Sequence, residues 1–202
     1  MSTRVSKGQK VDLTKNRPGL RQLLVGMGWQ ANADLELDTA VFLLGANGRT
    51  ADDEDFVFYG NPRHRTGAVE HRENPAGGDR QEVQVDLAAL PDAVQKLAFT
   101  ATIYDADARR QNFGQVTGAY LRLIDAANGA ELLRYELGTD FSVETAIVVG
   151  EIYRYKGAWK FSAVGAGFRG GLAALCRNFG ITVSEGQGAA PSPPAPTAPQ
   201  PT

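Results

Sequence analysis

Carboxylates recur at every second position near the start of the chain. Within residues 33–44 they are Asp34, Glu36 and Asp38, with aliphatic side chains between them. Successive side chains of a strand point to opposite faces, so we expect the three carboxylates on one face, roughly 7 Å apart. Two interpretations follow: calcium relieves their repulsion, because it takes oxygen ligands, or the face is solvated and paired with Lys or Arg of a neighbouring strand.

Further oxygen donors occur in two later segments. Residues 60–82 lack the periodicity of a strand or helix and contain Glu73, Asn74 and Asp79 among glycines. A long irregular segment of this kind is either functional or disordered. Its composition suits a cation-binding loop and equally a mobile surface loop. Asp105 stands at the end of an expected buried strand and adds one more carboxylate to the candidate set.

The residue sets of common enzymes are not found in the sequence. His64 and His71 are the only histidines and are not spaced as metal ligands; a nucleophile elbow, a phosphate-binding loop and a dinucleotide fingerprint are all missing. A glycosidase would need two carboxylates at a sugar cleft, and no aromatic-lined cleft is apparent. Cys176 lies in an apolar run and is expected to be buried. We therefore expect a protein that is not an enzyme.

Short strands separated by turn residues dominate the expected secondary structure. We expect strands over residues 5–13, 20–29, 34–44, 56–59, 82–87, 96–104, 120–124, 131–137, 144–155 and 159–165. One helix is expected over residues 172–179, with Gly180 as its C-terminal cap. This pattern favours a mainly β fold, a two-sheet antiparallel β-sandwich with one short C-terminal helix.

Composition bounds the class of protein. The chain has 202 residues, 43% of them hydrophobic, and a net charge of −2 without a long basic run, so binding of nucleic acid is not supported. The N-terminus has no apolar signal region, and no apolar run reaches the roughly 20 residues that span a bilayer, so we expect a cytoplasmic protein. Residues 186–202 are rich in Pro and Ala and are expected to be a disordered tail after a folded domain over residues 1–185.

Several blocks of the sequence resemble the TerD family of tellurium-resistance and stress-response proteins. They occur in order along the folded part: residues 6–11 (SKGQKV), 26–29 (GMGW), 38–44 (DTAVFLL), 53–59 (DEDFVFY), 111–116 (QNFGQV) and 170–176 (GGLAALC). The resemblance implies a calcium-binding β-sandwich that acts in resistance to tellurite and other stresses, with no known catalysis. It also implies partners among other stress-response proteins of the same system, at the inner face of the membrane.

Two departures from the family pattern bear on the metal. The family's acidic strand reads like DFDLDAS, whereas here Leu35 and Glu36 replace its aromatic residue and its middle aspartate. The second acidic loop is shortened, and Arg80 and Gln81 stand where relatives carry acids, so Arg80 is expected to neutralise part of the site. The sequence therefore predicts at least one Ca²⁺, bound by Asp34, Asp38, Glu73, Asn74 and Asp79 with Glu36 and Asp105 as further donors. The alternative is an interaction or membrane-peripheral module in which calcium binding is weakened or lost.

Overall fold

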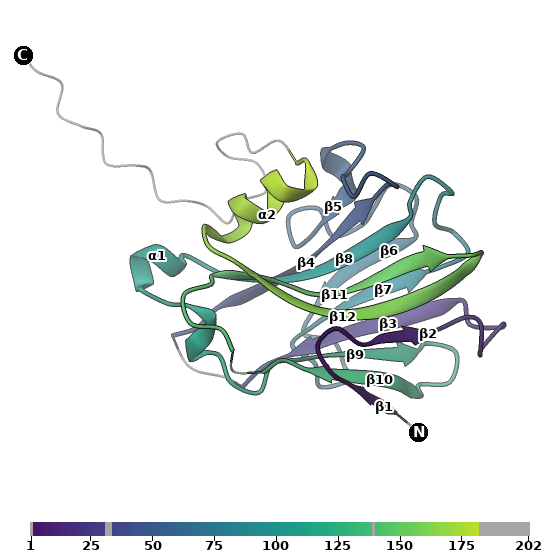
Figure 1. Ribbon diagram of the computed structural model, residues 1–202, viewed down its shortest axis with the longest axis horizontal. Coiled ribbons are helices and arrows are strands. Elements are labelled where there is room, and N and C mark those ends of the chain that lie inside the picture. The colour runs from purple at the N-terminus through teal and green to yellow at the C-terminus, as the bar shows by residue number, and fades with distance from the viewer. Residues whose placement is uncertain (1, 31–33, 139, 182–202) are drawn as a thin grey trace, which may run out of the picture.

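The computed structural model describes residues 2–30, 34–138 and 140–181, which form two six-stranded sheets packed face to face (Figure 1). The expected C-terminal tail lies outside the described residues. The first sheet has the order β1 (Thr3–Val5), β10 (Glu131–Glu136), β9 (Tyr120–Asp125), β3 (Gln22–Gly28), β7 (Gln81–Asp86) and β6 (Val69–Glu73). The second has the order β2 (Lys10–Asp12), β12 (Ala158–Phe168), β11 (Ala146–Tyr155), β8 (Lys96–Ile103), β4 (Leu37–Leu44) and β5 (Phe56–Val57). The predicted two-sheet sandwich is confirmed.

The N-terminal segment divides between the two sheets. β1 runs parallel to β10 in the first sheet, while β2 runs antiparallel to β12 in the second. Between them the chain makes a tight turn, in which Gln9 N–H donates to the Ser6 carbonyl at 2.9 Å and Gly8 takes a positive φ of 86°. The prediction of one strand over residues 5–13 is therefore wrong, because a turn that needs glycine's left-handed backbone interrupts it.

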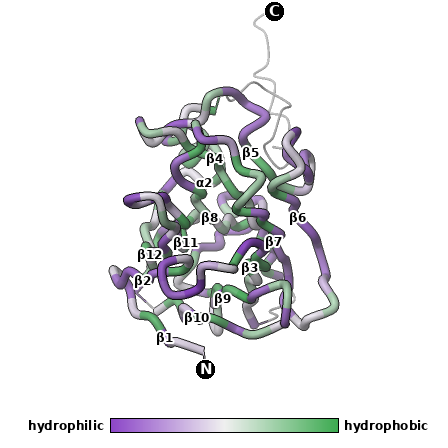
Figure 2. Tube along the Cα trace, turned by 90° about the vertical axis from the view of Figure 1, so that its right-hand side faces the viewer, coloured by the Kyte–Doolittle hydropathy of each residue, from purple (hydrophilic) through white to green (hydrophobic). Residues whose placement is uncertain are grey.

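Apolar side chains of alternating parity fill the space between the sheets. On β3, Leu23, Val25 and Met27 point inward and are buried, as their spacing predicts. The opposite parity carries Gly26 and Gly28, against which the side chains of other residues lie directly. In Figure 2 hydrophobic stretches lie along strands such as β4 and β5, whereas β6 and several connections are hydrophilic.

A helix covers part of the second sheet from outside. In α2 (Gly171–Phe179), Leu175, Cys176 and Phe179 are buried against the outer face of β4, β8 and β11. Gly180 ends the helix with a left-handed backbone (φ 88°), and burial raises the pKa of the Cys176 thiol to about 11. The predictions for this helix, its cap and its cysteine are confirmed.

Three short helical segments were not expected from the sequence. They are α1 (Ala106–Arg109) and two 3-10 turns, η1 (Asp53–Asp55) and η2 (Phe113–Gln115). α1 has one turn, too short for an apolar periodicity to show, so the expectation of a single helix is wrong.

Candidate functional site

The acidic segment enters the second sheet later than predicted. β4 begins one residue before Asp38, so Asp34 and Glu36 precede the strand and only Asp38 lies in it. The neighbouring strand β8 ends at residue 103, and the chain then turns away through Asp105, whose backbone is left-handed (φ 52°). The backbone pairing ends with the Tyr104 N–H, which donates to the Glu36 carbonyl at 2.8 Å. Asp34 and Glu36 therefore lie outside β4, and the predicted strand over residues 34–36 is wrong.

Asp38 is the centre of a negatively charged cluster. Burial, and then repulsion from Glu73 and Glu36, raises the pKa of Asp38 to about 6. Burial, followed by the charges of Asp38, Tyr104 and Glu73, raises the pKa of Tyr59 as well. Among the described residues no basic side chain forms a salt bridge with Asp38 or Glu73. The cluster thus contains carboxylates close enough to repel one another and short of a cation.

A buried polar network lies between the two sheets next to this cluster. The Thr39 N–H and hydroxyl donate to Gln81 Oε1 at 2.7 and 2.5 Å, and His71 Nε2 lies 3.0 Å from Thr39 Oγ1. Burial lowers the pKa of His71, so the ring is neutral at pH 7 and its Nε2–H can donate to the threonine oxygen. Because Thr39 follows Asp38 and His71 lies two residues before Glu73, the network joins β4 to β6 and β7 close to both carboxylates.

This network was not predicted from the sequence. The segment over residues 60–82 contains β6, whose inward positions Val69 and His71 are both buried. The alternation of Val69, His71 and Glu73 against Glu70 and Arg72 was the available signal. Charged residues at three of its five positions, Glu70, Arg72 and Glu73, concealed it.

Asp79 is separated from this cluster and already neutralised. Its side chain is fully buried over Gly26, where a Cβ atom would overlap it. Arg122 donates to both carboxylate oxygens, with Nη2 at 2.9 Å from Oδ2, and the Tyr120 hydroxyl donates to Oδ1 at 2.6 Å. Burial and the hydrogen bond to Asp79 raise the pKa of Tyr120 to about 12. Asp79 has its hydrogen-bond capacity largely filled without a metal.

The other predicted donors have separate surroundings. Arg109 Nη1 lies 3.2 Å from Glu36 Oε1, and Arg109 Nε lies 4.0 Å from Asp105, so one guanidinium serves both carboxylates. Asn74 begins the β6–β7 turn with a left-handed backbone (φ 50°), and its N–H donates to the Arg80 carbonyl at 3.0 Å.

Arg80 does not take the expected place beside the acidic loop residue. Its guanidinium lies 6.0 Å from the centre of the Trp29 ring and donates to the Trp29 carbonyl at 3.4 Å. The neutralising arginine is Arg122, which lies 43 residues beyond Asp79. Charge compensation of this loop by an arginine was predicted, but the arginine is Arg122 and not Arg80.

The donor set fits calcium only in part. Within the part of the chain that the structure describes, no three His, Cys, Asp or Glu side chains are grouped to hold a metal ion. Asp79 does not fit, because Arg122 already occupies its oxygens. Asp38 and Glu73 do fit a hard cation, as uncompensated carboxylates. Calcium takes six to eight oxygens, so backbone carbonyls or water would have to supply most of them.

Comparison with known proteins decides the family. The profile described as the TerD domain matches residues 1–179. The chain belongs to the TerD family. General stress protein 16U of Bacillus subtilis is 47% identical over 192 residues, which cover 91% of this chain and all of that protein. The tellurium resistance protein TerD of Alcaligenes sp. is 46% identical with the same coverage, and an uncharacterised Bacillus subtilis protein, YceE, is 48% identical.

Solved structures of TerD relatives share the fold. A homologue of the telluride resistance protein from Streptomyces coelicolor A3(2) superposes with a TM-score of 0.60 at 20% identity, covering 78% of this chain and 95% of its own. A crystal structure of a protein of unknown function superposes at 0.64, with 21% identity and 82% and 99% coverage. Among the described residues of this TerD-family chain, no helix is long and apolar enough to cross a membrane.

Proposed function

We propose that this TerD-family protein is a calcium-dependent binding protein of a tellurite-resistance and general stress response. In this proposal it acts in the cytoplasm by metal-controlled association with other proteins of the same response, at the inner face of the membrane, and not by catalysis. The cation binds at the cluster of Asp38 and Glu73, with Glu36 at its border. The names of relatives as tellurium-resistance and general stress proteins support the biological setting.

The observation that carries the proposal is the raised pKa of Asp38. A half-buried carboxylate whose pKa reaches about 6 through burial and two like charges is held ionised at pH 7 at a cost in free energy. A divalent cation would remove that cost. Because the cluster has only two uncompensated carboxylates, the affinity should be modest, since the number of charged ligands tunes calcium affinity.

Calorimetric titration of calcium into the full chain tests the proposal. Wild-type protein should release or absorb heat with a saturable profile, and Asp38→Asn should abolish it. Asp92→Asn is the matched control, because Asp92 is an exposed aspartate on the β7–β8 connection. Equal titration profiles for wild type and Asp38→Asn would refute the cluster as the site.

The ion pair of Asp79 favours a second candidate function. With an internal guanidinium on the loop aspartate, the protein could have exchanged part of its metal dependence for a fixed charge and serve as an interaction module without calcium. If the wild type shows no heat of binding with millimolar calcium, the calcium-dependent function is refuted and this alternative takes its place.

A further inference from the structure

The lysines of this chain are gathered on one part of its surface. There are six, and each lies on or beside β2, β8, β11 or β12: Lys7, Lys10, Lys15, Lys96, Lys156 and Lys160. The fifteen arginines are spread over both sheets and the loops. Composition alone does not produce this segregation, because the chain as a whole carries a net charge of −2.

Strand register places this set on the outer face of the second sheet. Lys96, Tyr153, Lys160 and Asp12 stand opposite one another across β8, β11, β12 and β2. Ala98 has the parity of Lys96 and packs under α2, so the row is on the α2 side of the sheet. The β11–β12 hairpin extends beyond α2 there (Figure 1). We call this set the lysine face: the exposed Lys10, Lys156 and Tyr155 with the half-buried Lys96, Lys160 and Tyr153.

Positive charge is in excess on the lysine face. Two carboxylates lie among these lysines. Asp12 is 3.6 Å from Lys160, and Glu151 is 3.2 Å from Lys96. No carboxylate of the described chain pairs with Lys10 or Lys156. The arginines of the first sheet differ, because Arg4, Arg72, Arg122 and Arg134 all form salt bridges. The lysine face is thus a place where cationic groups remain available.

Two tyrosines complete the face. Tyr155 is 51% exposed, an unusual exposure for a large aromatic side chain. The ammonium groups of Lys156 and Lys160 lie 5.3 and 5.2 Å from the centre of its ring. A ring already engaged by two ammonium groups is poorly placed to stack on a nucleic-acid base. Tyrosine next to lysine is instead the combination found at the interface of a bilayer with water.

We propose that the lysine face docks on an anionic phospholipid surface. The exposed part of β8, β11, β12 and β2 presents its cationic groups side by side on one sheet face, so several can approach a membrane plane together. Each lysine near an anionic leaflet contributes about 1 kcal/mol of attraction. The Tyr155 ring enters the headgroup region. This docking rests on the membrane location in the proposed function and adds the surface that would provide it. It requires no metal, so a failure of the calcium site would leave it standing.

Vesicle co-sedimentation of the full chain tests the docking. Vesicles contain either phosphatidylcholine alone or an equal mixture with phosphatidylglycerol, in low salt with EDTA. We expect binding to the mixed vesicles alone and its loss at high salt, because ions screen surface charge. Lys10→Gln with Lys156→Asn should lower the partition coefficient roughly thirtyfold; asparagine suits the left-handed backbone at residue 156 (φ 48°).

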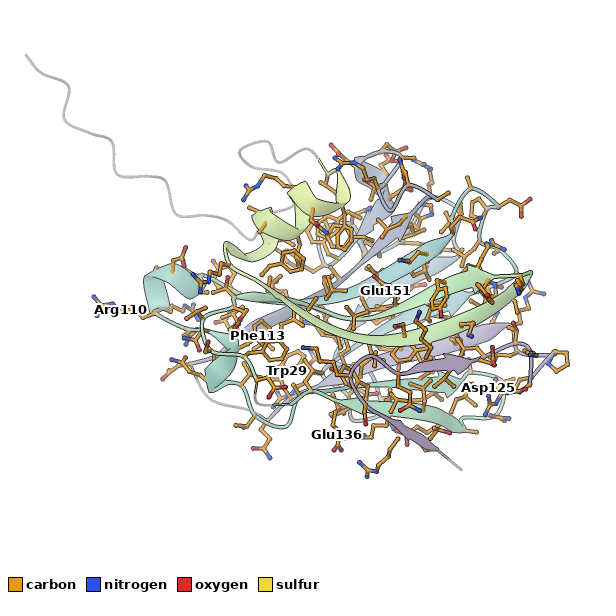
Figure 3. All side chains as sticks on the ribbon, in the orientation of Figure 1. Trp29, Arg110, Phe113, Asp125, Glu136 and Glu151 are labelled. Atoms are coloured by element: carbon orange, nitrogen blue, oxygen red, sulfur yellow. The ribbon has the colours of Figure 1, made fainter. Side chains whose placement is uncertain are left out.

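The matched control removes the same charge elsewhere. Arg63→Gln with Arg110→Asn keeps the net charge of the lysine variant, and residue 110 has a similar left-handed backbone (φ 53°). Arg110 projects from the end of the molecule beyond α1, away from Glu151 beside the lysine face (Figure 3). This variant should bind as the wild type does, and thermal melts should show that both variants fold.

Three outcomes would overturn the docking proposal. They are no binding of wild type to the mixed vesicles, equal losses in the lysine and control variants, and binding that requires calcium. A labelled single-stranded oligonucleotide is titrated in parallel. Lysine-dependent binding of the oligonucleotide without vesicle binding would assign the face to nucleic acid instead.

Discussion

Asp38 and Asp79 show how differently one residue type is treated within a single domain. Asp79 is buried with four hydrogen bonds from Arg122 and Tyr120, whereas Asp38 is half-buried with carboxylates as its charged neighbours. Asp79 thus belongs to a buried ion pair, whereas Asp38 carries a charge that no cation neutralises. Both residues were predicted to bind the same metal ion. The sequence shows that they are acidic, but not which side chains folding places next to them.

Replacing Asp38 tests the unrelieved charge directly. The pKa of Asp38 is about 6 in the folded protein, above the reference value of 3.8. The folded state therefore holds this proton more tightly than the unfolded state, and the free energy of unfolding falls as pH rises from 3.8 through 6. In EDTA, Asp38→Asn should be more stable than wild type at pH 8 by about 1 kcal/mol, after allowance for solvent screening. The difference should shrink towards zero at pH 4.5. Urea unfolding at both values measures it, and equal stabilities at pH 8 would contradict it.

Breaking the pair of Asp79 should have the opposite effect. Arg122→Gln leaves a buried carboxylate without its cation and should lower the free energy of unfolding by about 2–3 kcal/mol, because a broken buried pair costs more than its net contribution. The double variant Asp79→Asn/Arg122→Gln should lose less than the sum of the two single variants. Arg4→Gln, at an exposed pair with Glu136, should leave the urea midpoint unchanged. Strict additivity would show that the two side chains do not interact.

Among the elements, α2 is the clearest link between sequence pattern and packing. Its apolar residues recur at helical spacing, and the positions that this spacing selects cover Phe42, Ala98 and Val148 of the second sheet. Phe179 lies 4.7 Å from Phe42 between ring centres, which adds an aromatic contact to the burial. The helix closes an apolar surface that the sheet would otherwise expose.

Truncating a buried side chain of α2 measures how much the packing of this helix contributes to the free energy of unfolding. Leu175 is fully buried, so Leu175→Ala should lower the free energy of unfolding by about 2–5 kcal/mol through lost transfer energy and a cavity. Leu172 is only partly buried against the same cluster, so Leu172→Ala should cost clearly less. The comparison is made by urea denaturation of both variants. A larger loss at residue 172 would mean that the helix packs in another rotation.

The elements also show what the sequence could and could not predict. β3, β4 from residue 37, β8 and α2 follow local periodicities, and each was predicted near its observed bounds. The assignment of β1 and β2 to different sheets was not predictable, because partners more than a hundred residues away decide it. The contact of Arg122 with Asp79 has the same origin, since nothing local to either residue signals it. Local periodicity therefore predicts these strands and the helix, whereas the ion pairs around the site depend on tertiary contacts.

At the scale of the whole molecule, the negatively charged cluster and the lysine face are separate, since Asp38 lies on β4 of the second sheet and Glu73 on β6 of the first. β4 is near one edge of the second sheet, whereas the lysine face is formed mainly by β2, β11 and β12 at the other. A cation and a membrane surface could thus be bound at once without competing for the same side chains.

Metal binding should be visible as a change in the stability of the whole domain. A ligand that binds only the folded state raises the free energy of unfolding by about 2.7 kcal/mol at a hundredfold excess over its Kd. Calcium should therefore raise the melting temperature of wild type and not of Asp38→Asn. Magnesium should act weakly, because it demands octahedral geometry and retains its water. Equal shifts by the two ions would indicate nonspecific screening of charge.

The division of residues 3–12 between the two sheets bears on co-translational folding. β1 pairs with β10 and β2 pairs with β12, so β1 has no partner until residues 131–136 have been synthesised, and β2 has none until residues 158–168 have been. At roughly 5–20 residues per second, the N-terminal segment waits about 8–30 s for its partners. During that interval β1 and β2 have no partner strands, and the nascent chain exposes open strand edges to which other chains could add. These two strands can complete the edges of the two sheets only after β10 and β12 have been synthesised.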